Sequence, residues 1–329
     1  MKIGIPRALL YYYYHPLWKT FFEKLGFEVV TSGKTTKELI DKGIKASVPE
    51  ICVPIKIFNG HVLELLEAGV DYIFIPRMMS TRKGGFYCPK FMGLPDLVRY
   101  SIPGAKDKIL FPKVTSLTDD ISDFKIYSKM GDALGASKKQ IKAALLDGQK
   151  AWIEFRRITK EGYTALEVLD YVETGKKPQN PIKDYRVTIG LMGYVYDVYD
   201  EFVSMGIVDK LREMGVLVET FEMMDENLLD AELSDMNKRL FWTFSNKLLA
   251  AGYKFFKDGH IDGIIHVTAF GCGPDSLIGK IMELDSNEFG KPFMTIRVDE
   301  HTGENHLLTR IEAFIDMIYR EKVKAKKEA

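Results

Sequence analysis

The order in which strand-like and helix-like segments alternate is the feature that most constrains the fold of this chain. Residues 2–6, KIGIP, predict a strand, and the segment after them predicts a helix that ends at Gly26. A second strand is expected at residues 27–31. Further along, the segment NGHVLELLEAG predicts a helix around residues 60–68. The apolar run DYIFIP, residues 71–76, is then typical of a strand that is buried on both faces. This β-α-β order predicts a parallel sheet covered by helices.

The second half of the chain repeats this order. Residues 185–193, YRVTIGLMG, predict a strand, which is followed by a helix that ends at Gly215 and by a further strand. The runs GVDYIFIP and HIDGIIHV then occupy matching places in the two halves. We infer two similar α/β lobes, because self-similarity along a chain indicates a repeated structural unit. The alternative is that any two α/β domains share this succession of elements without being copies.

The length of 329 residues also favours two domains. We expect an N-terminal α/β lobe at residues 1–130, a helical linker at 131–180 and a C-terminal α/β lobe at 181–329. Within the linker, Ser137 and Gln140 have the spacing of a capping box at a helix start. Apolar positions between residues 307 and 318 predict an amphipathic helix at the end of the C-terminal lobe.

Charge and missing motifs argue against several classes of protein. The 46 acidic and 46 basic residues balance to a net charge of zero, whereas nucleic-acid binders carry a basic excess. Charges or helix breakers interrupt every apolar run well before about 18 residues, so we expect a cytoplasmic protein with no membrane partner. The sequence lacks G-x-x-x-x-G-K-S/T, G-x-S-x-G and a G-x-G-x-x-G after either opening strand. An ATPase, a serine hydrolase and an ordinary dinucleotide enzyme are therefore disfavoured.

Three cysteines stand out because each has a glycine or proline within two positions. They are Cys52 in PEICVPIK, Cys88 in GGFYCPKFMG and Cys272 in AFGCGPDS. Cys88 and Cys272 follow predicted strands, and ligands of open parallel sheets bind at the carboxyl ends of strands. Glycine and proline beside a thiolate suit a backbone that must come close to a bulky anionic group. The odd, low number of cysteines favours reduced thiols over a disulfide scaffold.

The residues alone leave the role of these thiols open. A single cysteine is most often a small buried hydrophobic residue. Three thiolates with His61 or His266 could bind zinc, although His266 lies within a predicted strand and a core role is more usual there. An iron–sulfur cube with three protein ligands would leave one iron open for substrate. The sequence contains no C-x-x-C, so no standard zinc or ferredoxin spacing decides between these sites.

Longer stretches of the sequence resemble one known superfamily. The stretches are KIGIPRALLYYYYHPLW, ASVPEICVPIKIFNGHV, YIFIPRMMS, FYCPKFMGLPDL, FGCGPDS and DEHTGENHLLTRIEAF. They are similar to stand-alone proteins related to the activase and dehydratase components of the 2-hydroxyacyl-CoA dehydratase and benzoyl-CoA reductase superfamily, which includes double-cubane-cluster proteins. The resemblance implies two Rossmann-like lobes with parallel sheets, linked by a helical segment, with an iron–sulfur cluster in the cleft between them. It also implies that Cys52, Cys88 and Cys272 ligate this cluster.

The resemblance further implies a partner and a reaction. An ATP-dependent activase with its own [4Fe-4S] cluster would pass low-potential electrons to this protein, for reduction or reductive dehydration of a small substrate such as an acyl-CoA. The chain departs from the family pattern because it has only three cysteines and no identifiable CoA site. We therefore expect one [4Fe-4S] cluster per chain, or a double cubane shared by two chains in a homodimer or heterodimer. The alternatives are a zinc-stabilised binding or assembly module and an electron-relay or scaffold subunit without its own substrate.

Other polar side chains are further candidates. They are Glu50, Lys56, Arg77 and Lys90, near Cys52 or Cys88, and the acid–base group Asp299, Glu300, His301 and Glu304. Cations near the thiols would favour an anionic cluster, although surface charges are usually only solvated. The acid–base group fits the start of a helix equally well. The run YYYY at residues 11–14 could line a cofactor, but packing in a core is favoured.

Overall fold

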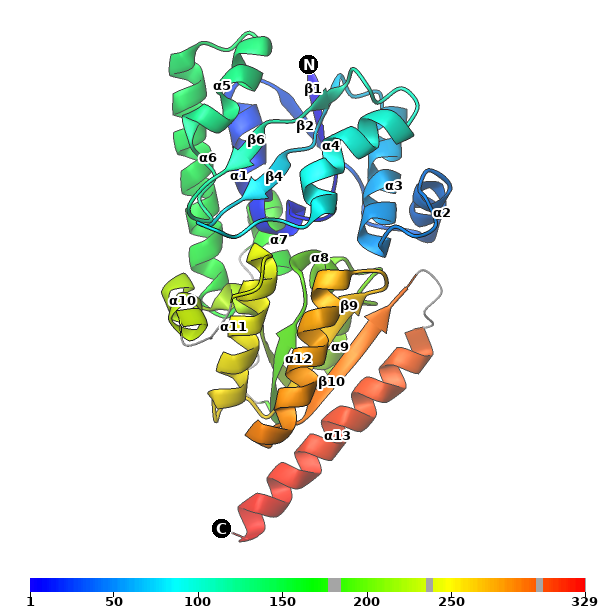
Figure 1. Ribbon diagram of the computed structural model, residues 1–329, viewed down its shortest axis with the longest axis vertical. Coiled ribbons are helices and arrows are strands. Elements are labelled where there is room, and N and C mark those ends of the chain that lie inside the picture. The colour runs from blue at the N-terminus through cyan, green and yellow to red at the C-terminus, as the bar shows by residue number, and fades with distance from the viewer. Residues whose placement is uncertain (177–184, 235–238, 300–303, 329) are drawn as a thin grey trace. The chain divides into compact units, whose positions relative to one another are not determined.

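The computed structural model describes residues 1–176, 185–234, 239–299 and 304–328. The chain forms two compact units (Figure 1). The first unit comprises Met1–Arg157 and Leu240–Thr243, and the second comprises Ile158–Arg239 and Phe244–Ala329.

The first unit is built on a four-stranded parallel sheet with the strand order β2-β1-β3-β5. A separate pair of parallel strands, β4 and β6, forms a second small sheet. The strands are β1 (Lys2–Ile5), β2 (Glu28–Thr31), β3 (Tyr72–Phe74), β4 (Arg77–Ser80), β5 (Ile109–Leu110) and β6 (Lys113–Thr115). The helices are α1 (Tyr11–Lys24), α2 (Lys37–Lys45), α3 (Val53–Glu67), α4 (Pro89–Ser101), α5 (Phe124–Ala133) and α6 (Lys138–Thr159).

The second unit contains a four-stranded parallel sheet with the order β10-β9-β7-β8. The strands are β7 (Val187–Met192), β8 (Val216–Glu219), β9 (Gly263–Ala269) and β10 (Phe293–Val298). The helices are α7 (Ala165–Thr174), α8 (Val195–Tyr199), α9 (Ile207–Glu213), the 3-10 helix η1 (Phe221–Met223), α10 (Glu226–Ser234), α11 (Thr243–Lys257), α12 (Gly273–Phe289) and α13 (Glu304–Glu328). Every residue of β7 and β9 is buried, as expected for inner strands of a parallel sheet.

The two large sheets have the same topology. When the strands are numbered by their order along the chain within each large sheet, both sheets run second, first, third, fourth. In both, the first and third strands are central neighbours, and the chain reverses its direction of travel across the sheet between them. The predicted α/β fold with two Rossmann-like lobes is therefore confirmed, and the repeated pattern in the sequence corresponds to a repeated topology.

The tetratyrosine run belongs to the core of the first unit. Residues 11–14 form the first turn of α1, and all four rings are buried. The hydroxyl groups of Tyr13 and Tyr14 donate hydrogen bonds to Asp119, to its Oδ2 at 2.9 Å and its carbonyl oxygen at 3.0 Å. The indole of Trp152 on α6 donates to the Tyr13 carbonyl at 2.9 Å. These rings pack and anchor helices, as the core interpretation predicts.

Some local predictions need correction or extension. Helix α3 was expected near residues 60–68, but it begins at Val53, since Pro54 occupies an early helical position that needs no N–H donor. Strand β4 was not predicted. The capping box is confirmed, because the Ser137 amide donates to Gln140 Oε1 at 2.9 Å and the Gln140 amide donates to Ser137 Oγ at 3.3 Å.

The segment predicted as a helical linker, residues 131–180, contains α6 and α7. The predicted domain boundaries themselves stay a prediction. In the described parts of the chain, no helix is both long enough and apolar enough to cross a membrane.

Candidate functional site

All three cysteines occupy the same local position, the N-cap of a helix. Cys52 precedes α3, Cys88 precedes α4 and Cys272 precedes α12, each with an extended backbone. The carbonyls of the three cysteines accept hydrogen bonds at 3.0 Å from the amides of Ile55, Phe91 and Ser276, respectively. A proline stands at the first or second position of each helix, where its missing N–H breaks no helical hydrogen bond. One local pattern therefore recurs three times.

The parallel topology places these helix starts at the carboxyl ends of the strands, where open α/β sheets bind ligands. Cys88 follows the third strand of the first sheet, and Cys272 follows the third strand of the second sheet, so the two thiols hold equivalent positions in the two lobes. Cys52 begins the helix that leads into β3. Gly271, beside Cys272, has a φ of 81°, a left-handed conformation that side chains other than glycine rarely adopt.

These positions suit thiolate ligands. A helix N-terminus carries a partial positive charge and amide N–H groups without helical acceptors, both of which stabilise a thiolate. Each cysteine is partly exposed, and none forms a disulfide in the described part of the chain. Among the residues that the structure describes, the first turns of α3 and α4 contain no acidic residue. The three partly exposed thiols are chemically able to ligate a metal centre, and the identity of that centre stays a prediction.

Burial modifies the chemistry of Cys88. Removal from water raises the pKa of the Cys88 thiol, since burial penalises the charged thiolate. The backbone of Phe91 and Lys90 opposes this rise in pKa, as does the Lys90 ammonium. A thiol with a raised pKa is a weak nucleophile, whereas a bound metal would favour the thiolate directly.

The cysteines are divided between the two units. Cys52 and Cys88 belong to the first unit and Cys272 to the second. Over the described ranges, no group of three or more His, Cys, Asp or Glu side chains could hold a metal ion. Neither unit by itself therefore offers a complete metal site in those ranges. Ligation of one cluster by all three thiols stays a prediction.

The two histidines proposed as zinc ligands are engaged in the protein core. His61 is fully buried in α3, with its Nε2 3.0 Å from Thr35 Oγ1. Burial, and secondarily the charge of Arg7, lowers the pKa of His61 to about 3, so the ring is neutral. His266 is fully buried in β9, with its Nε2 3.0 Å from Asp275 Oδ1. Both rings thus have a hydrogen-bonding partner within the protein.

Arg77 has a structural role, because its side chain connects two elements of the first unit. Its guanidinium donates to the Met92 carbonyl and to Asp96 Oδ2, both at 2.7 Å, and so ties β4 to α4, the helix that Cys88 begins. Of the other charges near the thiols, Lys56 is buried within α3, and Glu50 and Lys90 are exposed. The acid–base group in the C-terminal segment stays a prediction, because Glu300 and His301 lie outside the described residues.

Replacing Arg77 by alanine is expected to lower the free energy of unfolding by about 1–2 kcal/mol, because a charged hydrogen-bond donor is removed from two acceptors. Denaturant unfolding measures the change. The exposed Lys83 nearby provides the control, since Lys83→Ala should change stability by less than about 0.5 kcal/mol. Equal effects of the two substitutions would contradict the structural role of Arg77.

A segment distant in sequence holds the loop before Cys88. The Phe86 amide donates to the Phe241 carbonyl at 3.1 Å, and the Thr243 amide donates to the Phe86 carbonyl at 2.8 Å. The rings of Phe86 and Phe241 stack with centroids 5.1 Å apart. Residues 240–243 thus belong to the first unit, although the chain on both sides of them belongs to the second. Sequence patterns carry no signal for this long-range pairing.

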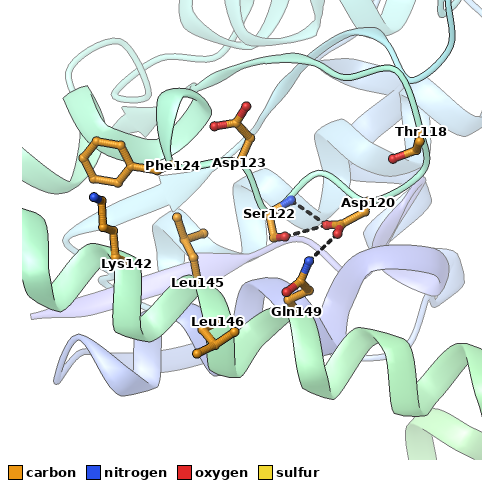
Figure 2. A pocket seen from close by; sticks show the side chains of 9 residues that line it. All are labelled: Thr118, Asp120, Ser122, Asp123, Phe124, Lys142, Leu145, Leu146 and Gln149. Carbon is orange, nitrogen blue, oxygen red and sulfur yellow. Dashed lines mark hydrogen bonds between the residues drawn. The ribbon is translucent and has the colours of Figure 1, made fainter.

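A cavity of about 390 Å³ lies in the first unit, away from the thiols in the sequence (Figure 2). Its lining comes from α6 and from residues 118–124. Asp120 accepts hydrogen bonds from the amide of Ser122 at 2.9 Å, from the Ser122 hydroxyl at 2.5 Å and from Gln149 (Figure 2). The Asp120 carboxylate is thus engaged within the protein, and the charged side chains of Asp123 and Lys142 also line the cavity. No cysteine lines it.

Two comparisons with known proteins bear on this site. The family model described as "CoA enzyme activase uncharacterised domain (DUF2229)" matches residues 2–224. The match covers more than half of the chain and includes Cys52 and Cys88, whereas Cys272 lies beyond it. A comparison with curated proteins finds no match.

Proposed function

Because the chain belongs to the CoA enzyme activase uncharacterised domain family, we propose that it is an iron–sulfur protein that receives electrons from an ATP-dependent activase. The electrons would serve the reduction or reductive dehydration of a small substrate, for which an acyl-CoA is the class that the superfamily resemblance favours. The observation that carries this proposal is the repeated N-cap position of the three cysteines at the carboxyl ends of parallel strands.

The protein's part would be to hold and shield the reaction centre. Cys52, Cys88 and Cys272 would ligate a [4Fe-4S] cluster, either one per chain or as a double cubane shared by two chains. When bound, such a cluster supplies an electron-accepting centre with one iron that lacks a protein ligand. The helix N-termini behind the thiols would stabilise the negative charge of that centre. Glycine and proline beside each thiol allow the backbone to approach closely.

The proposed partner is an activase with its own iron–sulfur cluster. No Walker-type phosphate loop occurs in this sequence, so ATP hydrolysis would be the task of that partner. The proposed assembly is a homodimer or a heterodimer, in which a second chain would complete a shared double cubane or a substrate site.

Iron and sulfide analysis of the anaerobically purified full chain tests this proposal. We expect about four iron and four acid-labile sulfide per chain, with broad visible absorbance that bleaches when activase and ATP are added. Stoichiometric zinc without sulfide would overturn the proposal and favour the zinc-stabilised module. A cluster that is reduced by the activase but never reoxidised by acyl-CoA thioesters would favour the electron-relay subunit.

A further inference from the structure

Four buried polar side chains gather at the carboxyl end of the sheet in the second unit. His266 and Thr268 lie on β9 and, being two residues apart, on the same face of the strand. Asp275 lies in the first turn of α12, and Asp197 lies in α8, directly after β7. All four have a relative exposure of 0%. A fully buried group of this polarity requires compensation for its lost hydration.

The His266–Asp275 pair is held rigidly. His266 Nε2 lies 3.0 Å from Asp275 Oδ1. On the next turn of α12, a Cβ atom added to Gly279 would lie 2.6 Å from His266 Nδ1, so the helix rests closely against the imidazole ring. Asp275 Oδ2 has no hydrogen-bond partner among the described residues. Asp275 Oδ1 is therefore oriented by His266, whereas Asp275 Oδ2 remains available for a further hydrogen bond.

Asp197 has no compensation of this kind. Within the described parts of the chain, no side chain donates a hydrogen bond to either of its carboxylate oxygens, on which the Ala269 backbone alone acts as a donor. The Thr268 hydroxyl has no hydrogen-bond partner in the same ranges. The charged groups that act on Asp197 are the carboxyl groups of Asp275 and Asp200, both of which repel a second negative charge. Burial, followed by these two charges, raises the pKa of Asp197 well above its usual range, against a smaller opposing effect of the Ala269 backbone. Burial and the neighbouring carboxyl groups thus favour the protonated form of Asp197.

The place of the group in the fold suggests its use. In this sheet the chain reverses its direction of travel between β7 and β9, and such switch points are where doubly wound sheets bind ligands. Asp197 follows β7, and Cys272 follows β9. Asp197 therefore lies at the β7 side of the switch point, and Cys272, the proposed cluster ligand, lies at the β9 side.

We propose that Asp197 holds a proton in this buried group, beside the Asp275 side chain that His266 orients, and that Asp197 donates this proton to the substrate of the proposed reduction. The O–H bond of Asp197 breaks, its electron pair remains on the carboxylate, and the proton goes to the substrate atom that has received an electron from the iron–sulfur donor. Water then reprotonates Asp197. The donation step rests on the proposed function, whereas storage of the proton does not.

Infrared spectroscopy of the full chain with ¹³C-labelled aspartate tests storage of the proton without iron. We expect the carbonyl band of a protonated carboxylic acid at neutral pH, and its loss in Asp197→Asn. Asp200→Asn is the matched control and should retain the band, because it leaves Asp197 in place. Asp200 Oδ1 instead accepts hydrogen bonds from the amides of Phe202 and Val203. Absence of the band, its survival in Asp197→Asn, or a bound cation that this substitution releases would overturn the proposal.

Stability as a function of pH provides a second measurement. Above the pKa of an unfolded aspartate, about 3.9, the unfolded chain releases the Asp197 proton while the folded chain keeps it. The contribution of Asp197 to stability should therefore fall as the pH rises from there to the folded-state pKa, so the stability of Asp197→Asn relative to the unsubstituted protein should increase over this range. Parallel pH profiles of the two proteins would contradict storage of the proton.

Proton uptake during activase-driven turnover tests the donation step. In protein that retains its iron, Asp197→Asn should slow the reaction by about a hundredfold, with Asp200→Asn unchanged. An equal rate would overturn donation. A chain that lacks iron but shows the infrared band would instead disprove the proposed function, so the two failures are distinguishable.

Discussion

Serine in place of Cys272 is expected to remove most of the iron from the anaerobically purified protein. The substitution deletes one of three thiolate ligands, and a cluster held by two is readily lost. Serine is also a favoured N-cap residue, so α12 should still form and loss of iron can be attributed to loss of the ligand. Iron and sulfide counting, together with visible absorbance, measures the effect.

The same experiment decides whether a ligand comes from the second unit. Ser276→Ala in the same first turn of α12 provides the control and should leave the iron content unchanged. Cys52→Ser and Cys88→Ser should give losses as large as that of Cys272→Ser. Full iron retention in Cys272→Ser alone would show that the cluster needs only the region of the family match, residues 2–224.

Alanine in place of Gly43 is expected to destabilise the first unit by about 3 kcal/mol or more. A Cβ atom at Gly43 would lie 1.9 Å from the Lys56 carbonyl oxygen and 2.8 Å from the Gly60 amide nitrogen. Both are backbone atoms of α3, so no side-chain rotation can relieve the clash. A Cβ at Gly60 would in turn lie 2.3 Å from the Leu39 carbonyl oxygen on α2. The two helices therefore cross at a contact that only glycine permits.

Denaturant unfolding compares Gly43→Ala with a matched control in another helix. The dependence of the unfolding free energy on denaturant concentration is held equal for all variants. At Gly93 in α4, an added Cβ would meet no atom within 4 Å, so Gly93→Ala should stabilise the protein by up to about 1 kcal/mol. Because Cys52 caps α3, Gly43→Ala should also reduce the iron content. Unfolding midpoints that agree for Gly43→Ala and the unsubstituted protein would refute the close crossing.

Local signals were sufficient for the elements that carry the thiols. The apolar runs at residues 71–76 and 185–193 coincide with β3 and β7, because burial on both faces removes polar residues from central parallel strands. The prolines near the cysteines were interpreted as fixing the approach of the backbone to a bulky group, whereas in the structure they occupy helix starts. The predicted start of α3 was several residues too late. Ser137 and Gln140 cap α6 as predicted, since a capping box depends on four consecutive residues alone.

Long-range contacts decided the roles of several candidate residues. Arg77 could have served a cluster as a cation, but its guanidinium donates to α4. His61 could have been a zinc ligand, but it is buried against Thr35. The group around Asp197 was not predicted, because its members come from α8, β9 and α12 and share no sequence spacing. Burial of an ionisable group without an opposite charge beside it has no local signature.

The amino-acid sequence by itself determined the alternation of strands and helices, the repeated lobe and the N-cap setting of each cysteine, because hydrophobic period, glycine stops and proline starts act over a few neighbouring residues. Tertiary structure alone decided the strand order, the glycine contact between α2 and α3, and the burial of Asp197 beside Asp275. Those features depend on which apolar surfaces pack against each other and exclude water. Ionisable groups that are far apart in the chain are then brought close enough to shift one another's pKa.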